Sequence, residues 1–297
     1  MHPLITKSPA DHLRTRLGDL QASVEEIEPR RVLRRLISAY RRNELLVYAG
    51  AISFRAFAAI IPLLLFAIGL LGFLNLQEVW RNDIAPDIKP NVSPAAFQVI
   101  DDTVKNVLER RQLFWVTVGA ALTVWEVSGA MRMIMRATNR IYGAKETRSL
   151  PAFFGVSIAL GLVATLLILG AVSLVKFGPL LVEAVIGKGT LIGVVAFLIQ
   201  WGLAASLLIL LVGIVVRIAP AKRLPIQWVS LGALVVVVAW IVMSLLFGAY
   251  LTYVANYGSA FGNLATVFVT LEYVFLSSVV FVTGIQIDAL AYEEAED

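Results

Sequence analysis

The chain has 297 residues, of which 59% are hydrophobic and 15% are charged, and its mean hydropathy is +0.81. Soluble domains are about 45–50% apolar and about 25% charged, so this composition excludes a soluble globular enzyme, a disordered protein and a fibrous protein. In so apolar a chain, the formal net charge of +4 points to loops that face lipid headgroups rather than to nucleic acid.

Residues 1–44 are expected to form a polar cytoplasmic tail that ends in a basic amphipathic helix. Within residues 29–42, arginines occupy one helix face and apolar side chains occupy the other. A calmodulin-binding or nucleic-acid-binding arm has a similar pattern. Because a spanning segment begins directly afterwards, we interpret this segment as an interfacial helix on anionic lipid.

Six segments are long and apolar enough to cross about 30 Å of hydrocarbon, which takes about 20 residues of helix. They are residues 45–73, 113–134, 152–175, 191–216, 229–254 and 264–287. The sequence therefore predicts an all-α integral membrane protein with a six-helix transmembrane domain over residues 45–287.

The first loop of this domain, residues 74–112, contains a second amphipathic segment. Pro94 can begin a helix that runs to Arg111, with Phe97, Ile100 and Val104 on its apolar side. Such a helix either caps the outer mouth of the bundle or rests on the membrane surface.

Loop charges predict the orientation of the spans. Nine Lys and Arg residues precede the first span, and the connections after the second and fourth spans are also basic. The loops on the opposite side are nearly balanced in charge. Basic loops stay in the cytoplasm, so both termini are expected inside, including the acidic tail 288–297.

Three ionisable residues lie within the predicted spans: Arg55, Glu126 and Glu272. Charges in the bilayer rarely face lipid, so a substrate pathway or an internal pair is the default hypothesis. Estimated depths place Arg55 and Glu272 near the middle of the membrane, and we expect them to neutralise each other. The pair either fixes helix register or lines a polar cavity, unless one span boundary is misjudged and that residue snorkels. Glu126 is expected nearer the cytoplasm, without an obvious partner.

Two further features concern the first and second spans. Pro62 removes a backbone hydrogen bond within the first span and predicts a kink, either structural or a hinge. Arg132, Arg136 and Arg140 recur every four residues and share one helix face. Together with Arg148 they either anchor the cytoplasmic side or hold an anionic headgroup.

Enzymatic signatures are missing from this chain. There is no cysteine, the two histidines are His2 and His12, and no predicted span contains Asp or His. Intramembrane aspartyl, serine and zinc proteases each need groups that the spans lack, and there is no phosphate-binding loop. We expect no metal, no cofactor and no enzymatic activity.

Three segments resemble the YihY/virulence factor BrkB family of bacterial inner-membrane proteins. They are YAGAISFRAFAAIIPLLLF at 48–66, RATNRIYGAKETR at 136–148, and the last span, 261–289. The motif positions are Asn139, Arg140, Tyr142, Gly143, Gly262, Gly284 and Gln286. The chain departs from the pattern at Arg55, where an aromatic residue is expected, at Glu272, where an apolar or aromatic one is expected, and at Gln286, where an acid is expected.

The resemblance implies a multi-pass protein of the bacterial cytoplasmic membrane. The family's former label, ribonuclease BN, is regarded as mistaken, and members have been linked to serum resistance and to movement of lipid precursors. We therefore expect a transporter-like protein that moves or exposes an amphipathic, anionic lipid or lipid-linked substrate. The alternatives are a channel or small-solute transporter, and a non-catalytic envelope scaffold. The expected partners are anionic lipids, and no nucleic acid is expected. A second copy of the chain or a component of the envelope machinery is an open alternative.

Overall fold

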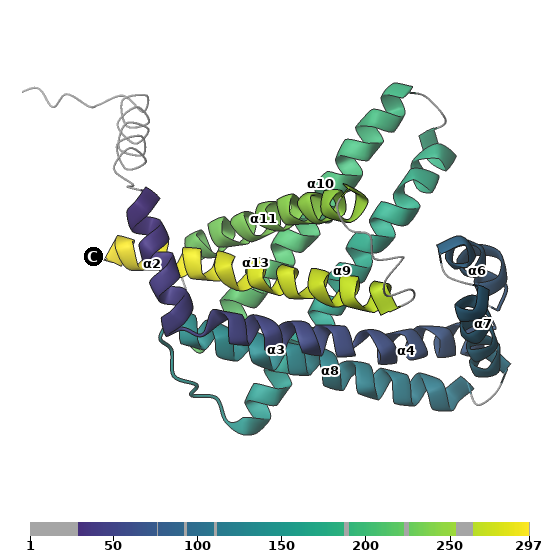
Figure 1. Cartoon of the computed structure of the whole chain (residues 1–297), viewed down its shortest axis with the longest axis horizontal. Coiled ribbons are helices and arrows are strands. Elements are labelled where there is room, and N and C mark those ends of the chain that lie inside the picture. The colour runs from purple at the N-terminus through teal and green to yellow at the C-terminus, as the bar shows by residue number, and fades with distance from the viewer. Residues whose placement is uncertain are drawn as a thin grey trace, which may run out of the picture. The chain divides into compact units, whose positions relative to one another are not determined.

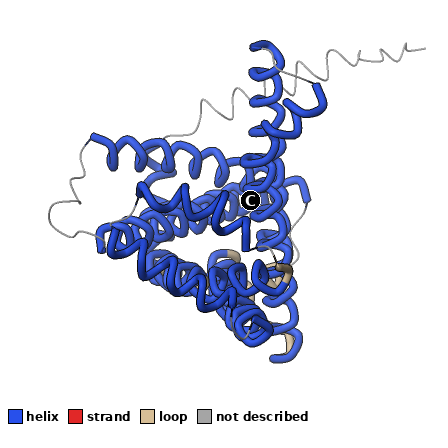
Figure 2. Tube along the Cα trace, turned by 90° about the vertical axis from the view of Figure 1, so that its right-hand side faces the viewer, coloured by secondary structure: helices blue, strands red, loops and turns tan. Residues whose placement is uncertain are grey.

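The computed structural model describes residues 29–75, 77–91, 94–109, 112–186, 190–222, 226–253 and 264–296. Helices joined by short loops make up this part of the chain, and it contains no strand (Figure 2). The elements are α2 (Pro29–Arg42), α3 (Leu45–Ala58), α4 (Ile60–Phe73), α5 (Gln77–Val79), η1 (Trp80–Ile84), α6 (Ala85–Ile88), η2 (Lys89–Asn91), α7 (Pro94–Glu109), α8 (Gln112–Ile141), α9 (Leu150–Ile186), α10 (Thr190–Ile218), α11 (Ile226–Tyr253) and α13 (Leu264–Glu296).

The chain divides into two units, Met1–Glu44 and Leu45–Asp297. In the first unit, α2 forms with the bounds that its amphipathic pattern predicts. Its location on a membrane surface stays a prediction.

Within the described residues of the second unit, six helical segments are long and apolar enough to cross a membrane, which confirms the predicted fold class. Three helices run further than expected. α8 continues seven residues past position 134, α9 continues to Ile186, and α13 continues to Glu296 through most of the expected acidic tail.

Each span packs against the next along the chain, and the last packs against the first. α8 lies beside α3 and α4, α9 beside α8, α10 beside α9, α11 beside α10, and α13 beside both α11 and α3. The six spans therefore close into a ring. In Figure 1, α3 and α4 follow one another alongside α8, and α9 and α10 run obliquely to them.

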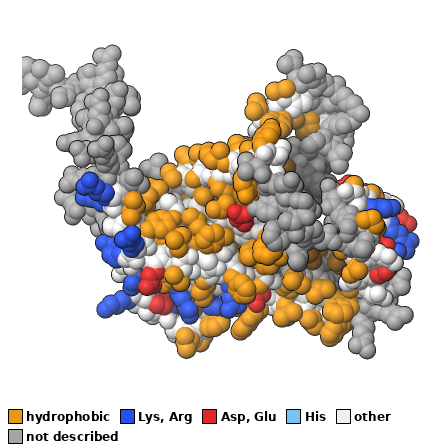
Figure 3. Space-filling view, viewed as in Figure 1, with side chains coloured by type: hydrophobic (Ala, Val, Ile, Leu, Met, Phe, Trp, Pro, Cys, Tyr) orange, Lys and Arg blue, Asp and Glu red, His pale blue; other side chains and the backbone are white. Residues whose placement is uncertain are grey.

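Glycines permit the close approach of α4 and α8. A Cβ atom on Gly119 would lie 2.6 Å from the backbone nitrogen of Phe66, and one on Gly69 would lie 2.9 Å from that of Val116. Hydrophobic side chains cover much of the face over the spans, while charged ones gather over α6 and α7 and along the lower left part of the view (Figure 3). This distribution is typical of a helix bundle whose surface meets lipid.

The segment between the first two spans folds into α5, η1, α6, η2 and α7. The helix predicted to begin at Pro94 is confirmed as α7, while the short helices before it were not expected. Trp80, Val104 and Leu108 form a buried cluster that also packs against Ile68 and Leu71 of α4. α7 therefore covers the end of α4, and we call this side of the bundle the loop end.

The opposite side of the bundle is called the basic end here. It is where α3 begins, where α8, α10 and α13 end, and where Arg136, Arg140 and Arg217 lie.

Candidate functional site

Arg55 of α3 and Glu126 of α8 form an ion pair between two neighbouring spans. The Nη1 atom of Arg55 donates a hydrogen bond to Oε2 of Glu126 at 3.1 Å. A Cβ atom on Gly129 would lie 3.1 Å from the Arg55 side chain, so glycine at this position makes room for the guanidinium. The exposed fraction of the side chain is 35% for Arg55 and 23% for Glu126, so the pair is only half-buried.

The pair lies near the middle of the membrane-spanning segments. Glu126 is at the centre of α8, which has 30 residues. Arg55 lies about 6 Å from the midpoint of the first span, Leu45–Phe73, at about 1.5 Å of rise per residue. An isolated charge at such a depth costs about 2.5–3.5 kcal/mol on insertion scales, and each of these residues offsets that cost for the other.

The predicted pairing of Arg55 with Glu272 is wrong. The depth of Glu126 was estimated for a span that ends at residue 134. Because α8 ends at Ile141, Glu126 lies further from the basic end of the helix and closer to its middle. Because α3 packs against both α8 and α13, helix adjacency alone does not determine whether Arg55 pairs with Glu126 or with Glu272. Glu272 has an exposed side chain about 12 Å from the start of α13, so its predicted burial is also wrong.

Arg132 is buried between α8 and α9, with 7% of its surface exposed. Its Nη1 atom donates to the hydroxyl oxygens of Ser128 at 3.0 Å and Ser157 at 3.4 Å. Its guanidinium carbon lies 5.5 Å from the ring centre of Trp125 and 4.6 Å from that of Phe154. Hydroxyl acceptors and aromatic faces thus stabilise a cation inside the membrane-spanning region. Sequence reasoning missed these partners, although the spacing of Ser128 and Arg132 by four residues was a usable signal.

The arginines of α8 continue from this point to the basic end. Gly129, on which Arg55 rests, is followed on one helix face by Arg132, Arg136 and Arg140. Arg136 and Arg140 are exposed, unlike Arg132. We call Arg55, Glu126, Arg132, Arg136 and Arg140 the arginine stripe. It covers about 21 Å along α8, from the middle of the membrane to the basic end.

The face of α8 that carries the stripe is not sealed within the helix ring. Leu122 and Trp125 continue the same face towards the loop end, and both have exposed side chains. A molecule in the membrane can therefore approach the stripe from the side.

The first span is irregular next to the stripe, where α3 ends at Ala58 and α4 begins at Ile60, two residues before Pro62. Ala59 between them keeps helical dihedrals, with φ −69 and ψ −19, so the span stays helical through this point. The amide of Ala59 still donates to the Arg55 carbonyl at 3.0 Å. The kink that Pro62 predicts, and its action as a hinge, stay predictions.

The motif at the end of α8 forms a helix stop. Gly143 has φ +60, the left-handed region that favours glycine. The amide of Ala144 donates to the carbonyl of Asn139 at 2.8 Å, and that of Gly143 donates to the carbonyl of Arg140 at 3.4 Å. Together these two bonds are a Schellman motif, which explains why the helix ends here.

Side chains of the same motif tie α8 to the end of α10. Oδ1 of Asn139 accepts a hydrogen bond from the amide of Ala221 at 2.7 Å, and its Nδ2 donates to Glu146 at 2.9 Å. Glu146 also accepts a hydrogen bond from the amide of Arg148 at 3.1 Å. Arg148 in turn donates to three carbonyls at the end of α10: Ile218 at 3.0 Å, Ala219 at 3.1 Å and Pro220 at 2.6 Å. It satisfies carbonyls that a helix end leaves without partners.

The last span joins the same network. The hydroxyl of Tyr142 donates to Oδ2 of Asp288 on α13 at 2.8 Å. Burial raises the pKa of Tyr142 above its ordinary value, and the neighbouring Asp288 raises it further, so the phenol stays protonated. Gly284 lets α13 approach Val236 of α11 closely, and Gln286 is buried. Gly262 lies outside the described residues.

Within the described part of the chain, no group of three or more His, Cys, Asp or Glu residues is placed to hold a metal ion. The arrangement of charges is instead suited to binding an anion beside apolar helices, because four of the five residues in the stripe are arginines.

Comparison with known proteins places the chain in a family. A family model described as Virulence factor BrkB matches residues 36–297. A similar protein is the ribonuclease-like protein YfkH of Bacillus subtilis (strain 168), which is 26% identical over 264 residues, or 88% of this chain and 95% of that protein. No solved structure shows a significant match. The chain is a membrane protein with six apolar spanning helices, and it belongs to the virulence factor BrkB family.

Proposed function

We propose that this protein moves or exposes an amphipathic, anionic lipid by guiding its headgroup along the arginine stripe. The observation that carries the proposal is the half-exposed pair of Arg55 and Glu126 in the middle of the membrane, followed by arginines as far as the basic end. Ionisable residues at this depth are costly and mark substrate pathways more often than chance.

The charge balance of the stripe favours an anionic headgroup. The stripe contains four arginines and one carboxylate, Glu126, which pairs with Arg55. Guanidinium groups bind phosphate and carboxylate oxygens through two parallel hydrogen bonds. A phosphate headgroup would therefore contact the exposed Arg136 and Arg140 and the half-exposed Arg55 in turn.

An apolar pocket of about 280 Å³ between α4, α8 and α9 supports the lipid part of the proposal. Leu63, Phe66, Val127, Leu162 and Leu169 are among the residues that line it. Its volume is just below the range of about 300–1,000 Å³ for ligand pockets. Its apolar lining is suited to hold part of an acyl chain.

The proposal includes an orientation and a location. We place the basic end and both termini in the cytoplasm, following the distribution of basic loops, and the protein in the bacterial inner membrane. It acts without catalysis, so that lipid movement is passive, coupled to an ion, or dependent on a partner.

Lipid exchange in liposomes tests the proposal. Purified protein should accelerate movement of fluorescent phosphatidylglycerol between leaflets, measured by quenching of the outer leaflet, and should accelerate phosphatidylcholine less. The variant Arg136→Gln/Arg140→Gln removes the two exposed arginines of the stripe and should reduce the acceleration about tenfold, because one charge-assisted hydrogen bond contributes at least about 1.5 kcal/mol.

The matched control is Arg217→Gln/Lys145→Gln, which removes two exposed basic side chains at the basic end that are not part of the stripe. This control should remain close to the unmodified protein. Folded protein that accelerates neither lipid would overturn the proposal. Ionic conductance in planar bilayers without lipid exchange would favour the channel alternative instead.

A further inference from the structure

A second hollow lies at the loop end, away from the arginine stripe. It has a volume of about 550 Å³ and is bounded by η1, α6, η2 and α7. We call it the loop pocket, and it is lined by Trp80, Arg81, Ala85, Pro86, Lys89, Phe97, Asp101 and Lys105.

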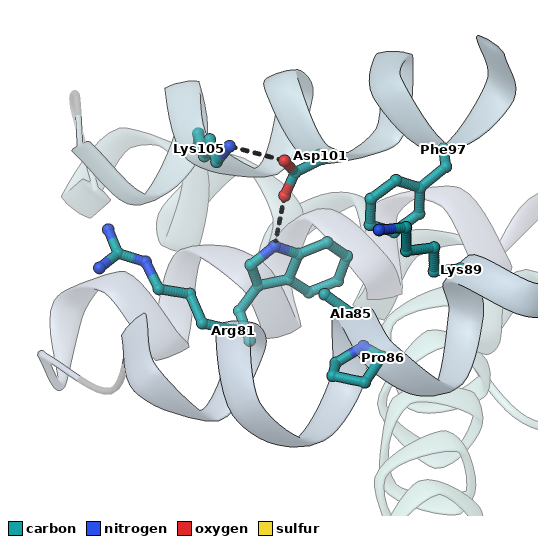
Figure 4. Close-up of a pocket in the computed structure, with 8 residues that line it drawn as sticks. Arg81, Ala85, Pro86, Lys89, Phe97, Asp101 and Lys105 are labelled. Atoms are coloured by element: carbon teal, nitrogen blue, oxygen red, sulfur yellow. Dashed lines mark hydrogen bonds and ion pairs between the residues drawn. The ribbon is translucent and has the colours of Figure 1, made fainter. Parts of the chain in front are cut away.

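The floor of the loop pocket is fixed by packing and hydrogen bonding. Trp80 is buried against Val104 and Leu108. Its Nε1 atom donates to Oδ1 of Asp101 at 3.0 Å, and Lys105 Nζ pairs with Oδ2 of Asp101 at 2.6 Å (Figure 4). Both oxygens of this carboxylate are therefore engaged.

Asp101 is held in its ionised form. The hydrogen bond from Lys105 is the main cause that lowers the pKa of Asp101 below its ordinary value, and the bond from Trp80 lowers it further. The Asp101 carboxylate also raises the pKa of Lys105. The pair is thus a neutral feature of the floor rather than a site for a cation.

Two further cations line the pocket. Arg81 and Lys89 are exposed and lie on opposite sides of Asp101 in Figure 4. Neither forms an ion pair with another described residue. The Nζ atom of Lys89 lies 5.9 Å from the ring centre of Phe97, which keeps the ammonium at the pocket wall.

We propose that the loop pocket binds a phosphate ester, with Arg81 and Lys89 on its two sides attracting the phosphate and the Phe97 ring contacting the rest of the ligand. The volume lies within the range of about 300–1,000 Å³ for ligand sites, and apolar walls with a few polar groups are typical of them. The phosphate ester comes either from a lipid headgroup or from a soluble metabolite.

The proposal goes beyond lipid movement along the stripe, because it concerns binding at the other end of the bundle. It can hold for a protein that moves no lipid. The test is therefore an equilibrium binding measurement rather than a transport measurement.

Calorimetric titration of the full chain in phosphatidylcholine nanodiscs tests it. The probes are glycerol 3-phosphate, for a soluble source, and dihexanoyl phosphatidic acid, for a lipid source, with dihexanoyl phosphatidylcholine as the probe for simple partitioning. We expect at least one phosphate monoester to bind, and the affinity ratio of the two identifies the source.

Matched variants assign the binding to the loop pocket. Arg81→Gln/Lys89→Gln should weaken binding about tenfold, the effect of losing a charge-assisted hydrogen bond of about 1.5 kcal/mol. The control Arg217→Gln/Lys145→Gln removes the same two residue types at the basic end and should bind like the unmodified protein. Asp101→Asn should strengthen binding about threefold, because it removes a negative charge beside the phosphate while leaving an acceptor for Trp80.

The proposal is overturned if neither monoester binds, or if both double variants bind equally well. It is also overturned if the phosphatidylcholine probe binds as tightly as the phosphatidic acid probe, since charge would then have no part in recognition. Weaker binding by Asp101→Asn would show that the carboxylate contacts the ligand and would contradict the assigned role of the two cations.

Discussion

Arg55 and Glu126 show how a charge can be kept in an apolar bundle. The Arg55 side chain needs the space above Gly129 as well as the carboxylate of Glu126, so three residues on two helices make up the unit. Arg132 is held differently, by Ser128, Ser157 and two aromatic rings. At the scale of single residues, each cation has a partner suited to its depth.

Charge reversal tests the pair. Arg55→Glu and Glu126→Arg each bring two like charges together in the middle of the membrane, and each should cost about 2–4 kcal/mol of stability. The double reversal should recover most of this loss, measured by the midpoint of thermal unfolding in detergent. As a control, Arg55→Glu combined with Glu272→Arg should show no recovery. A double reversal as unstable as the single variants would contradict the pair.

At the scale of elements, α9 passes through Pro179 because α10 supplies a replacement hydrogen bond. Proline has no amide hydrogen, so the Val175 carbonyl, four residues earlier, has no partner within the helix. Nε2 of Gln200 on α10 donates to that carbonyl at 2.7 Å. Gly178 leaves space for Gln200, since a Cβ atom there would lie 3.1 Å from its Oε1. The bond joins the two helices at the point where α9 lacks a bond of its own.

A double-mutant cycle measures this contribution. Gln200→Leu should cost about 1–2 kcal/mol in the unmodified protein, because it leaves the Val175 carbonyl without a donor. In the Pro179→Ala background, the new backbone amide can donate to the Val175 carbonyl within α9. Gln200→Leu should therefore be nearly neutral for stability in that background. The measurement is thermal unfolding of the four proteins in one detergent. Equal costs in both backgrounds would show that Gln200 acts independently of the proline.

At the scale of the whole molecule, the network at the basic end connects three spans. Asn139, Tyr142 and Arg148 link the end of α8 to the ends of α10 and α13 through hydrogen bonds to side chains and carbonyls. The loop end is organised instead by the apolar cluster of Trp80, Val104 and Leu108. The two ends of the bundle therefore differ chemically, as an oriented membrane protein requires.

Thiol labelling tests the proposed orientation, because the natural chain has no cysteine. Asn106→Cys on α7 and Lys145→Cys at the basic end are single exposed positions. In intact cells whose outer membrane has been permeabilised, a membrane-impermeant maleimide should label the first variant at once. It should label the second only after the inner membrane is opened. The reverse pattern would place the basic end outside.

The sequence by itself determined the six spans, the amphipathic helices at 29–42 and from Pro94, and the family, since these depend on local composition and on ordered motifs. It also marked Arg55, Glu126 and Arg132 as charges within spans. Only the tertiary structure decided that Arg55 pairs with Glu126, that Ser157 and Phe154 surround Arg132, and that Arg148 binds the end of α10. The physical reason is that hydropathy reports the length of a span but not its rotation or its true ends. A seven-residue error at one end of α8 changes the estimated distance of a side chain from that end by about 10 Å, and hence the residues expected at its depth.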